Sequence, residues 1–180
     1  MTGLATPLSH LAVPLALAAA LGPEHVPPGL MALALACAVL PDLDALGLWL
    51  GIPYEHPFGH RGFTHSLPFA AMLAGTGTLL APAVGAEPAW AFLVLFVSGA
   101  SHGLLDASTN GGLGVALFSP FSQRRLFLPW RVIEVSPLHP SELFSWRGLH
   151  VLHSEMRWVW APCGMLVLAG VAVRWLAGPA

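Results

Sequence analysis

Five long apolar segments, separated by shorter polar breaks, dominate the pattern of hydrophobic and polar positions along the chain. They cover residues 4–21, 29–51, 66–84, 88–108 and 158–176. Each has roughly the 17 to 25 residues that a membrane-spanning helix needs. The pattern predicts an all-α fold: a membrane-embedded bundle of about five transmembrane helices that forms a single integral membrane domain over residues 1–180.

The longest polar stretch, residues 109–157, precedes the last apolar segment and carries much of the charge. Trp130, Trp146, Trp158 and Trp160 lie in it or next to it. Tryptophan is enriched at the membrane interface. We therefore expect a long interfacial loop with short amphipathic pieces lying on the membrane.

The composition agrees with a membrane protein, because 56% of the residues are hydrophobic, only 9% are charged and the mean hydropathy is +0.71. A soluble domain carries about 25% charged residues. The net charge of -2 gives no indication of a nucleic-acid partner, and we expect none. No basic residue precedes Arg61, so the basic region of a signal peptide is missing and we expect the first apolar segment to be retained.

Counting the segments places the reactive side chains at one membrane face. If the first segment leaves that face, the second returns to it, the third leaves and the fourth returns. The residues near that face are then His10, Asp42, Asp44, His60, His65, His102 and Asp106. The segment count alone thus predicts that they converge.

Arginine is also distributed unevenly between the two faces, and the chain contains no lysine. Only Arg174 falls on the opposite side. The face of the reactive residues receives Arg61, Arg124, Arg125, Arg131, Arg147 and Arg157. Basic loops are cytoplasmic in multi-pass proteins, so we expect the active site and the N-terminus to face the cytoplasm and the C-terminus to lie across the membrane.

The three aspartates of the chain all lie in or beside apolar segments, where a carboxylate is costly and points to function. His102 and Asp106 are four residues apart, so both side chains share one helix face at a separation that suits one metal ion. Asp42 and Asp44 are two apart and would point in different directions on a regular helix. A buried histidine–carboxylate packing pair and helix capping are the structural alternatives.

The third element is the run GHRGFTHS, in which His60 and His65 flank a glycine-containing turn. Neutral imidazole is a good zinc ligand, although an isolated pair of this spacing is weak evidence. His25 and His56 suit ordinary loop positions. The roles of His139, His150 and His153 stay open.

The runs LPDLD, GHRGFTHSL and SHGLLD resemble the YdjM-like bacterial inner-membrane proteins, a family described as metal-dependent hydrolases. The resemblance extends from Ser9 to about Pro162, and the family is in turn similar to zinc-dependent phospholipases C and single-strand nucleases. It implies two or three zinc ions. The ligands it implies are His10, Asp42 or Asp44, His65, His102 and Asp106, with His60 as a ligand or a residue that orients one, and Asp106 able to bridge two ions.

For the third ion the resemblance is incomplete. The soluble phospholipases use a His-x3-Glu pair, whereas Glu155 lies five residues after His150 and two after His153. Glu155 is the nearest counterpart as a ligand. The soluble enzymes also use a processed N-terminal amino group, which a retained Met1 does not supply.

These observations predict a membrane-bound zinc-dependent hydrolase that cleaves phosphoester bonds in a membrane lipid or lipid-linked substrate. Asp42 or Asp44 would orient or deprotonate the attacking water, and Arg61, Arg124 or Arg125 would bind the substrate phosphate. The alternatives are an intramembrane zinc amidase of the ceramidase type and a non-enzymatic metal-binding membrane protein. The substrate, the metal and the oligomeric state are not set by the sequence.

Overall fold

The computed structural model describes residues 6–136 and 145–178, and in this part of the chain it is all-helical, as predicted. The β-structure of the described residues consists of two isolated bridges, Thr109 with Ile133 and Val115 with Leu126. The helices are α1 (Pro7–Leu21), α2 (Pro28–Val39), η1 (Leu40–Asp44), α3 (Ala45–Trp49), η2 (Phe63–His65), α4 (Leu67–Thr78), η3 (Pro82–Val84), α5 (Pro88–Ala107), α6 (Trp146–Glu155), the π-helical turn η5 (Met156–Trp160) and α7 (Ala161–Ala177).

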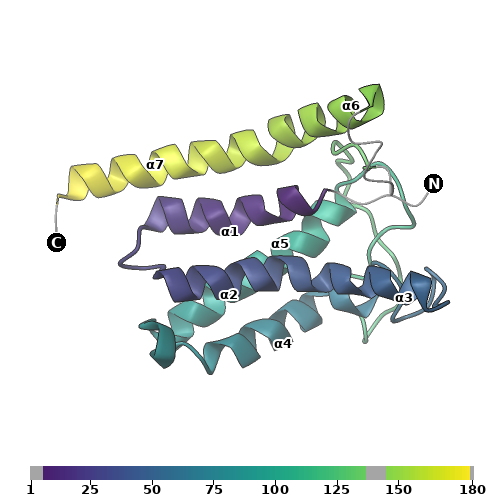
Figure 1. The fold of residues 1–180 in the computed structure, drawn as a ribbon, viewed down its shortest axis with the longest axis horizontal. Coiled ribbons are helices and arrows are strands. Elements are labelled where there is room, and N and C mark those ends of the chain that lie inside the picture. Colours follow the sequence, from purple (N-terminus) through teal and green to yellow (C-terminus); the bar gives the residue numbers. More distant parts are fainter. Residues whose placement is uncertain (1–5, 137–144, 179–180) are drawn as a thin grey trace.

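The long helices lie side by side and alternate in direction (Figure 1). The connections after α1, after α4 and the end of α7 lie at one end of the bundle. The turns after α3, the loop after α5 and the start of α6 lie at the other, which we call the site end. This arrangement has the alternation that the segment count requires.

Three of the five predicted segments form helices long and apolar enough to cross a membrane, namely Pro28–Trp49, Pro88–Ala107 and Trp146–Ala177. The helices of the first and third segments are shorter, with 15 residues in α1 and 12 in α4. Proline and glycine set several of these limits. Pro7 begins α1, and Gly22, whose φ of 88° favours glycine, directly follows its last residue.

Small residues let the helices approach closely. Ala34 of α2, Ala74 of α4 and Ala91 of α5 are almost completely buried in one apolar cluster with Leu30 and Leu95. Without a hydrophobic driving force inside lipid, tight packing of small residues is a principal source of helix association. This cluster occupies the part of the bundle remote from the site end and leaves the polar residues to the other end.

The last helix corrects one prediction. It begins at Trp146 rather than at residue 158, because α6, η5 and α7 follow one another as a continuous helix of 32 residues. At 1.5 Å per residue its length is roughly 48 Å, which exceeds the hydrocarbon thickness of about 30 Å. The excess is α6, at the site end, and it shortens the predicted interfacial loop.

The described part of that loop, residues 109–136, folds over the site end instead of forming amphipathic helical pieces. Its backbone bonds to the end of α5 and to the turn before η2: the Leu128 N–H donates to the carbonyl of Ala107, and the Ala116 N–H donates to that of Arg61. The Leu67 N–H in turn donates to the carbonyl of Leu117. These bonds hold the turn that carries Arg61 against the end of α5.

Glu155 ties α6 to the start of α1. Its carboxylate accepts hydrogen bonds of 2.6 Å from both the backbone N–H and the hydroxyl of Thr6, and Glu155 is 1% exposed. An acidic group is favourable at a helix N-terminus, where N–H groups lack partners. Pro14 has no N–H for the carbonyl of His10, so this contact supports the first turn of α1.

We predict that a reporter fused after Ala180 is extracytoplasmic, whereas one inserted at Ser122 in the site-end loop is cytoplasmic. The reason is that six arginines lie in site-end segments, while Arg174 bonds to the carbonyls of Ala19 and Ala20 at the other end. Paired alkaline phosphatase and fluorescent protein fusions measure both positions. Reporters on the same side would contradict the alternation of the helices.

Candidate metal centre

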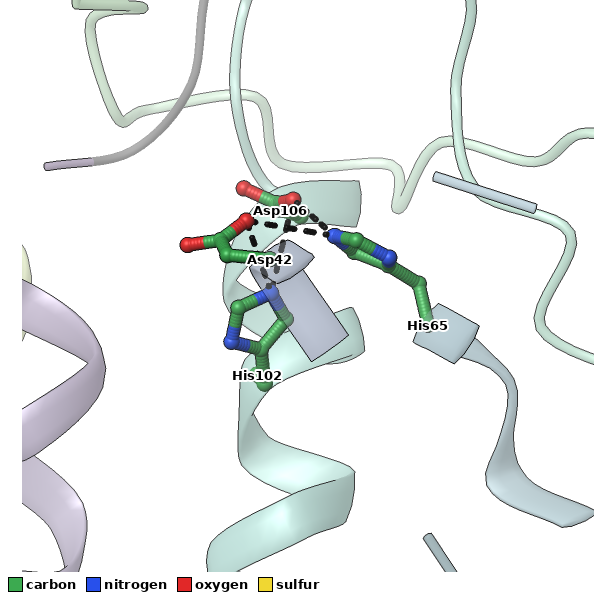
Figure 2. A group of neighbouring side chains, drawn as sticks. All are labelled: Asp42, His65, His102 and Asp106. Carbon is green, nitrogen blue, oxygen red and sulfur yellow. Dashed lines mark ion pairs between the residues drawn. The ribbon is translucent and has the colours of Figure 1, made fainter. Parts of the chain in front are cut away.

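Four side chains from three separate elements converge at the site end (Figure 2). Asp42 comes from η1, His65 from η2, and His102 and Asp106 from successive turns of α5. One donor atom from each lies within 4.8 Å of all the others. Asp42 Oδ1 is 3.6 Å from His65 Nε2 and 3.5 Å from His102 Nε2. Asp106 Oδ2 is 3.3 Å and 4.0 Å from the same two nitrogens.

These separations fit a divalent cation. A tetrahedral zinc with bonds of about 2.0 to 2.2 Å keeps its ligand atoms roughly 3.3 to 3.6 Å apart. Nε2 of His65, Nε2 of His102 and Oδ1 of Asp42 are buried and accept or donate no hydrogen bond within the described chain. Burying such atoms unsatisfied costs about 1–3 kcal/mol each. A cation among them would remove that penalty, so the residues present fit a metal ion.

The 3-10 turn η1 explains how both aspartates of LPDLD reach the site. Pro41 lies in this tighter turn between α2 and α3. Asp42 faces Nε2 of His65, while Asp44 Oδ2 lies 3.0 Å from Nδ1 on the other side of the same ring. The different directions expected from their spacing therefore place the two carboxylates on opposite sides of His65.

Asp44 orients the histidines rather than joining the four donor atoms. It pairs with Nδ1 of His60 at 2.7 Å and with Nδ1 of His65, and it accepts a hydrogen bond from Thr64 Oγ1. Asp44, His60 and His65 form a second group with metal-ligand spacing. A ligating histidine commonly donates its other N–H to a carboxylate, so we interpret Asp44 as the residue that fixes the rings.

His102 is fixed in the same way by the backbone. Its Nδ1 lies 2.7 Å from the carbonyl oxygen of Ala38 at the end of α2. A carbonyl oxygen can only accept, so Nδ1 carries the hydrogen and Nε2 presents its lone pair to the cluster. Both candidate histidine ligands thus have Nδ1 directed at an oxygen acceptor and Nε2 directed at the cluster.

The carboxylates also change the acidity of His65. Burial alone would lower its pKa, but its contacts with Asp106, Asp42 and Asp44 outweigh burial and raise the pKa well above the usual range. A proton and a metal ion would compete for Nε2, because a ligating histidine is neutral. Uptake of an ion would therefore release a proton from this ring.

Gly103 allows η2, which carries His65, to pack against α5, which carries His102 and Asp106. A Cβ added there would lie 2.2 Å from the carbonyl oxygen of His65, too close for any side chain. Between His102 and Asp106, a glycine is therefore required for η2 to pack against α5. The glycine of SHGLLD is thus as necessary to the site as its histidine and aspartate. It allows Nε2 of His65 to lie 3.3 Å from Asp106 Oδ2.

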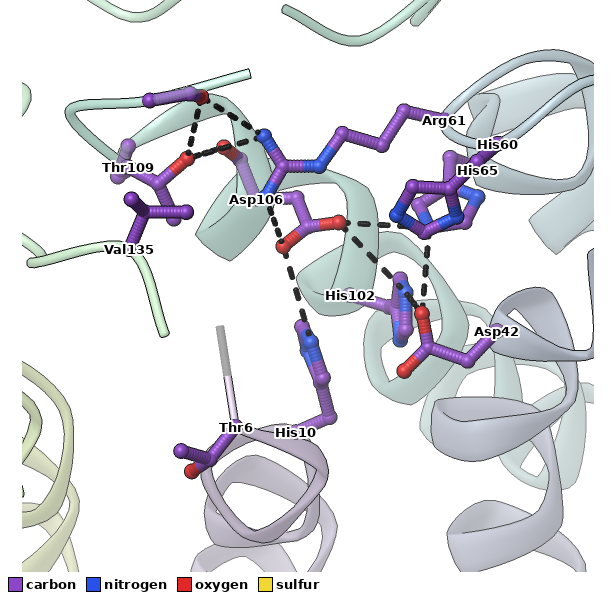
Figure 3. A network of polar contacts seen from close by, with 12 residues as sticks. Thr6, His10, Asp42, His60, Arg61, His65, His102, Asp106, Thr109 and Val135 are labelled. Carbon is purple, nitrogen blue, oxygen red and sulfur yellow. Dashed lines mark hydrogen bonds and ion pairs between the residues drawn. The ribbon is translucent and has the colours of Figure 1, made fainter. Parts of the chain in front are cut away.

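Arg61 lies beside the cluster with its guanidinium completely buried (Figure 3). Nη2 is 3.0 Å from Asp106 Oδ1, and Nη1 donates to the hydroxyl of Thr109 and the carbonyl of Gly111, both at 3.1 Å. Its φ of 60° is left-handed, which costs a residue with a side chain about 1–3 kcal/mol. Arg61 is therefore committed to the protein, which corrects its predicted role as a substrate clamp.

His10 borders the same cluster from α1 without joining the four donor atoms. Its ring stacks on that of His102 at 3.7 Å, and its Nε2 is 3.8 Å from Asp106 Oδ1. Both ring nitrogens are buried and have no hydrogen-bond partner among the described residues. The structure thus brings together all seven residues that the segment count had placed at one face.

Other predicted residues lie elsewhere. Glu155, predicted as a ligand, is bonded to Thr6 as described above, which corrects that assignment. Arg125 donates to the carbonyls of His60 and Tyr54, whereas Arg124 is exposed.

The remaining histidines lie outside the cluster. His150 and His153 are exposed on α6, and the exposed side chains of His25 and His56 agree with loop positions. His139 lies outside the described residues.

Two hydroxyl groups that support the centre were not predicted from the sequence. Thr64 bonds to Asp44, and Thr109 receives the guanidinium of Arg61. Thr64 could have been found, because it directly precedes His65 in the GHRGFTHS run. Thr109 gave no such signal, since its role depends on the fold of the loop after α5.

Comparison with known proteins identifies the family. The family model described as YdjM inner membrane protein matches residues 5–179. The inner membrane protein YbcI of Escherichia coli (strain K12) is 42% identical over 170 residues, which are 91% of this chain and 94% of the relative. The inner membrane protein YdjM of the same organism is 37% identical over 87 residues, 44% of each chain. No solved structure gives a significant match. The chain therefore belongs to the YdjM family of inner membrane proteins.

Proposed function

We propose that this protein is a zinc-dependent membrane hydrolase that cleaves phosphoester bonds in a lipid or lipid-linked substrate at the cytoplasmic face. The observation that carries the proposal is the convergence of donor atoms from Asp42, His65, His102 and Asp106. Those of Asp42, His65 and His102 are buried without a hydrogen-bond partner in the described chain. Two imidazole nitrogens and two carboxylate oxygens are a donor set that suits zinc. A divalent ion held by them would supply a Lewis acid and lower the pKa of a coordinated water to about 7.

The surroundings of Asp42 support a substrate that arrives from the bilayer. Its side chain is 15% exposed, whereas those of His65, His102 and Asp106 are fully buried. Next to it the exposed residues are apolar: Leu40 is 38%, Leu43 is 57% and Leu46 is 53% exposed. The open edge of the cluster thus lies on a surface that suits lipid contact. There Asp42 would orient the attacking water toward the substrate.

The polar groups around the four donors favour catalysis over a purely structural site. Nε2 of His60 and both nitrogens of His10 are buried without hydrogen-bond partners in the described chain. A structural zinc needs four ligands and gains nothing from further unsatisfied imidazoles. Groups of this kind can instead contact a substrate and its leaving group.

One observation favours a second candidate, a non-enzymatic metal-binding membrane protein. The four protein donors would complete a tetrahedron, as in structural zinc sites, whereas catalytic sites commonly have three protein ligands and one open position. Metal binding is shared by both candidates, so only substrate turnover separates them.

Substitution of the cluster should remove the metal without preventing membrane insertion. We expect His102→Ala and Asp106→Ala to lose bound zinc, because each removes one of four donors, while insertion follows hydropathy. Asp44→Asn should weaken zinc binding roughly 10- to 100-fold, as loss of an orienting partner does. Glu155→Gln is the control and should keep its zinc, because Glu155 contacts Thr6. Metal analysis of purified variants checks this, and full occupancy in both alanine variants would refute the site.

The hydrolase itself is tested by a screen of phospholipids and lipid pyrophosphates with the purified protein. Activity should disappear with a chelator, return with zinc, and be inhibited by vanadate, because oxyanions compete for a metal centre that binds phosphate oxygens. Chelator-sensitive cleavage of a ceramide that vanadate leaves unaffected would favour the amidase instead. Zinc binding without turnover of any substrate class would favour the non-enzymatic protein.

Recognition of the phosphate should depend on Arg124, whose side chain is exposed at the site end. Arg124→Ala should lower kcat/KM roughly tenfold or more, since a hydrogen bond to a charged group contributes about 1.5–3 kcal/mol. Arg174→Ala, at the other end of the bundle, is the matched control and should match the wild type. Equal kcat/KM values for all three proteins would exclude Arg124 as the phosphate ligand.

A further inference from the structure

Asp106 offers two oxygens, and only one of them belongs to the four-donor cluster. Oδ2 faces His65 and His102, whereas Oδ1 faces away from them toward Arg61 and His10 (Figure 3). A carboxylate in this position can bridge two metal ions. Asp106 Oδ1 and His10 Nε2, 3.8 Å apart, would then be the first ligands of the second ion.

A guanidinium already occupies that second position. Arg61 Nη2 lies 3.0 Å from Asp106 Oδ1, and both groups are completely buried. We propose that the centre holds one metal ion and that the guanidinium of Arg61 is a permanent cation in the place of a second. This inference rests on the metal-binding part of the proposed function and is independent of hydrolysis.

The charge balance supports one ion. Asp42, Asp44 and Asp106 bring three negative charges, Arg61 supplies one positive charge, and a single divalent ion supplies the other two. The histidines add none, because ligating imidazoles are neutral. A second divalent ion would leave two positive charges uncompensated at a buried site, and an unpaired buried charge is strongly unfavourable.

The protein also builds a dedicated site for the guanidinium. Thr109 and the carbonyl of Gly111 accept from Nη1, while Asp106 accepts from Nη2, so both terminal nitrogens of the guanidinium are held. Gly112 passes over it with a φ of 81°, and a Cβ there would lie 2.8 Å from Nη1. Gly112 therefore lets the loop after α5 pack closely against Arg61, as Gly103 lets α5 pack closely against His65.

The stoichiometry of bound zinc tests the proposal directly. Purified protein is saturated with zinc, freed of excess metal by gel filtration, and measured by elemental analysis with X-ray absorption spectroscopy. One zinc per chain is expected, with no metal–metal distance near 3.5–4 Å, the separation typical of two-metal sites. Two or more ions per chain would overturn the inference alone, whereas no zinc at all would overturn the proposed metal centre as well.

Variants of Arg61 show whether its guanidinium is the reason that the centre holds a single zinc ion. Arg61→Gln removes the cation and should raise the stoichiometry to two zinc ions, because Asp106 Oδ1 and His10 become available. The double variant Arg61→Gln with His10→Gln should return to one, and Arg61→Lys, which keeps the charge, should bind one. A single ion in a folded Arg61→Gln protein would overturn the role of Arg61. If that variant does not fold, the wild-type and Arg61→Lys measurements decide.

Discussion

Neutralising three carboxylates at one end of an apolar bundle is the constraint on which the centre depends. Asp42, Asp44 and Asp106 are the only aspartates of the chain, and each is paired with histidine, arginine or both. A carboxylate inside a membrane protein is costly unless it is paired. The remaining polar contacts follow from this, because Asp44 holds the rings of His60 and His65, and the carbonyl of Ala38 holds the ring of His102. Thr109 and the carbonyl of Gly111 hold the guanidinium of Arg61.

The same constraint explains how the elements are joined. The carbonyl of Ala38 at the end of α2 orients His102, the turn before α4 brings His65 against Gly103, and the loop after α5 encloses Arg61. The cluster near Leu30 packs the helices through apolar side chains. Packing therefore sets the helix directions, while polar contacts at the site end set the positions of the donor atoms.

The sequence predicted the all-α class and the convergence of the histidines and aspartates, because segment length and direction depend only on hydropathy. It placed the start of the last helix too late, because the polar residues of α6 resemble a loop although the helix is continuous. It could not distinguish Asp42 from Asp44, since their roles depend on the 3-10 turn at Pro41. The contact of Arg61 with Asp106 spans 45 residues, and nothing local indicates it.

Glu155 shows why chemical identity and location do not fix a role. It is an acidic residue at the site end, as a ligand would be, yet its oxygens satisfy the N–H and hydroxyl of Thr6. That contact lies one turn before His10, where Pro14 leaves the helix with one hydrogen bond fewer. The position of His10 beside Asp106 thus depends on a residue of α6 that is far away in the sequence. A buried carboxylate near a metal centre can therefore serve the centre by holding the helix of a neighbouring residue, without contacting the ion.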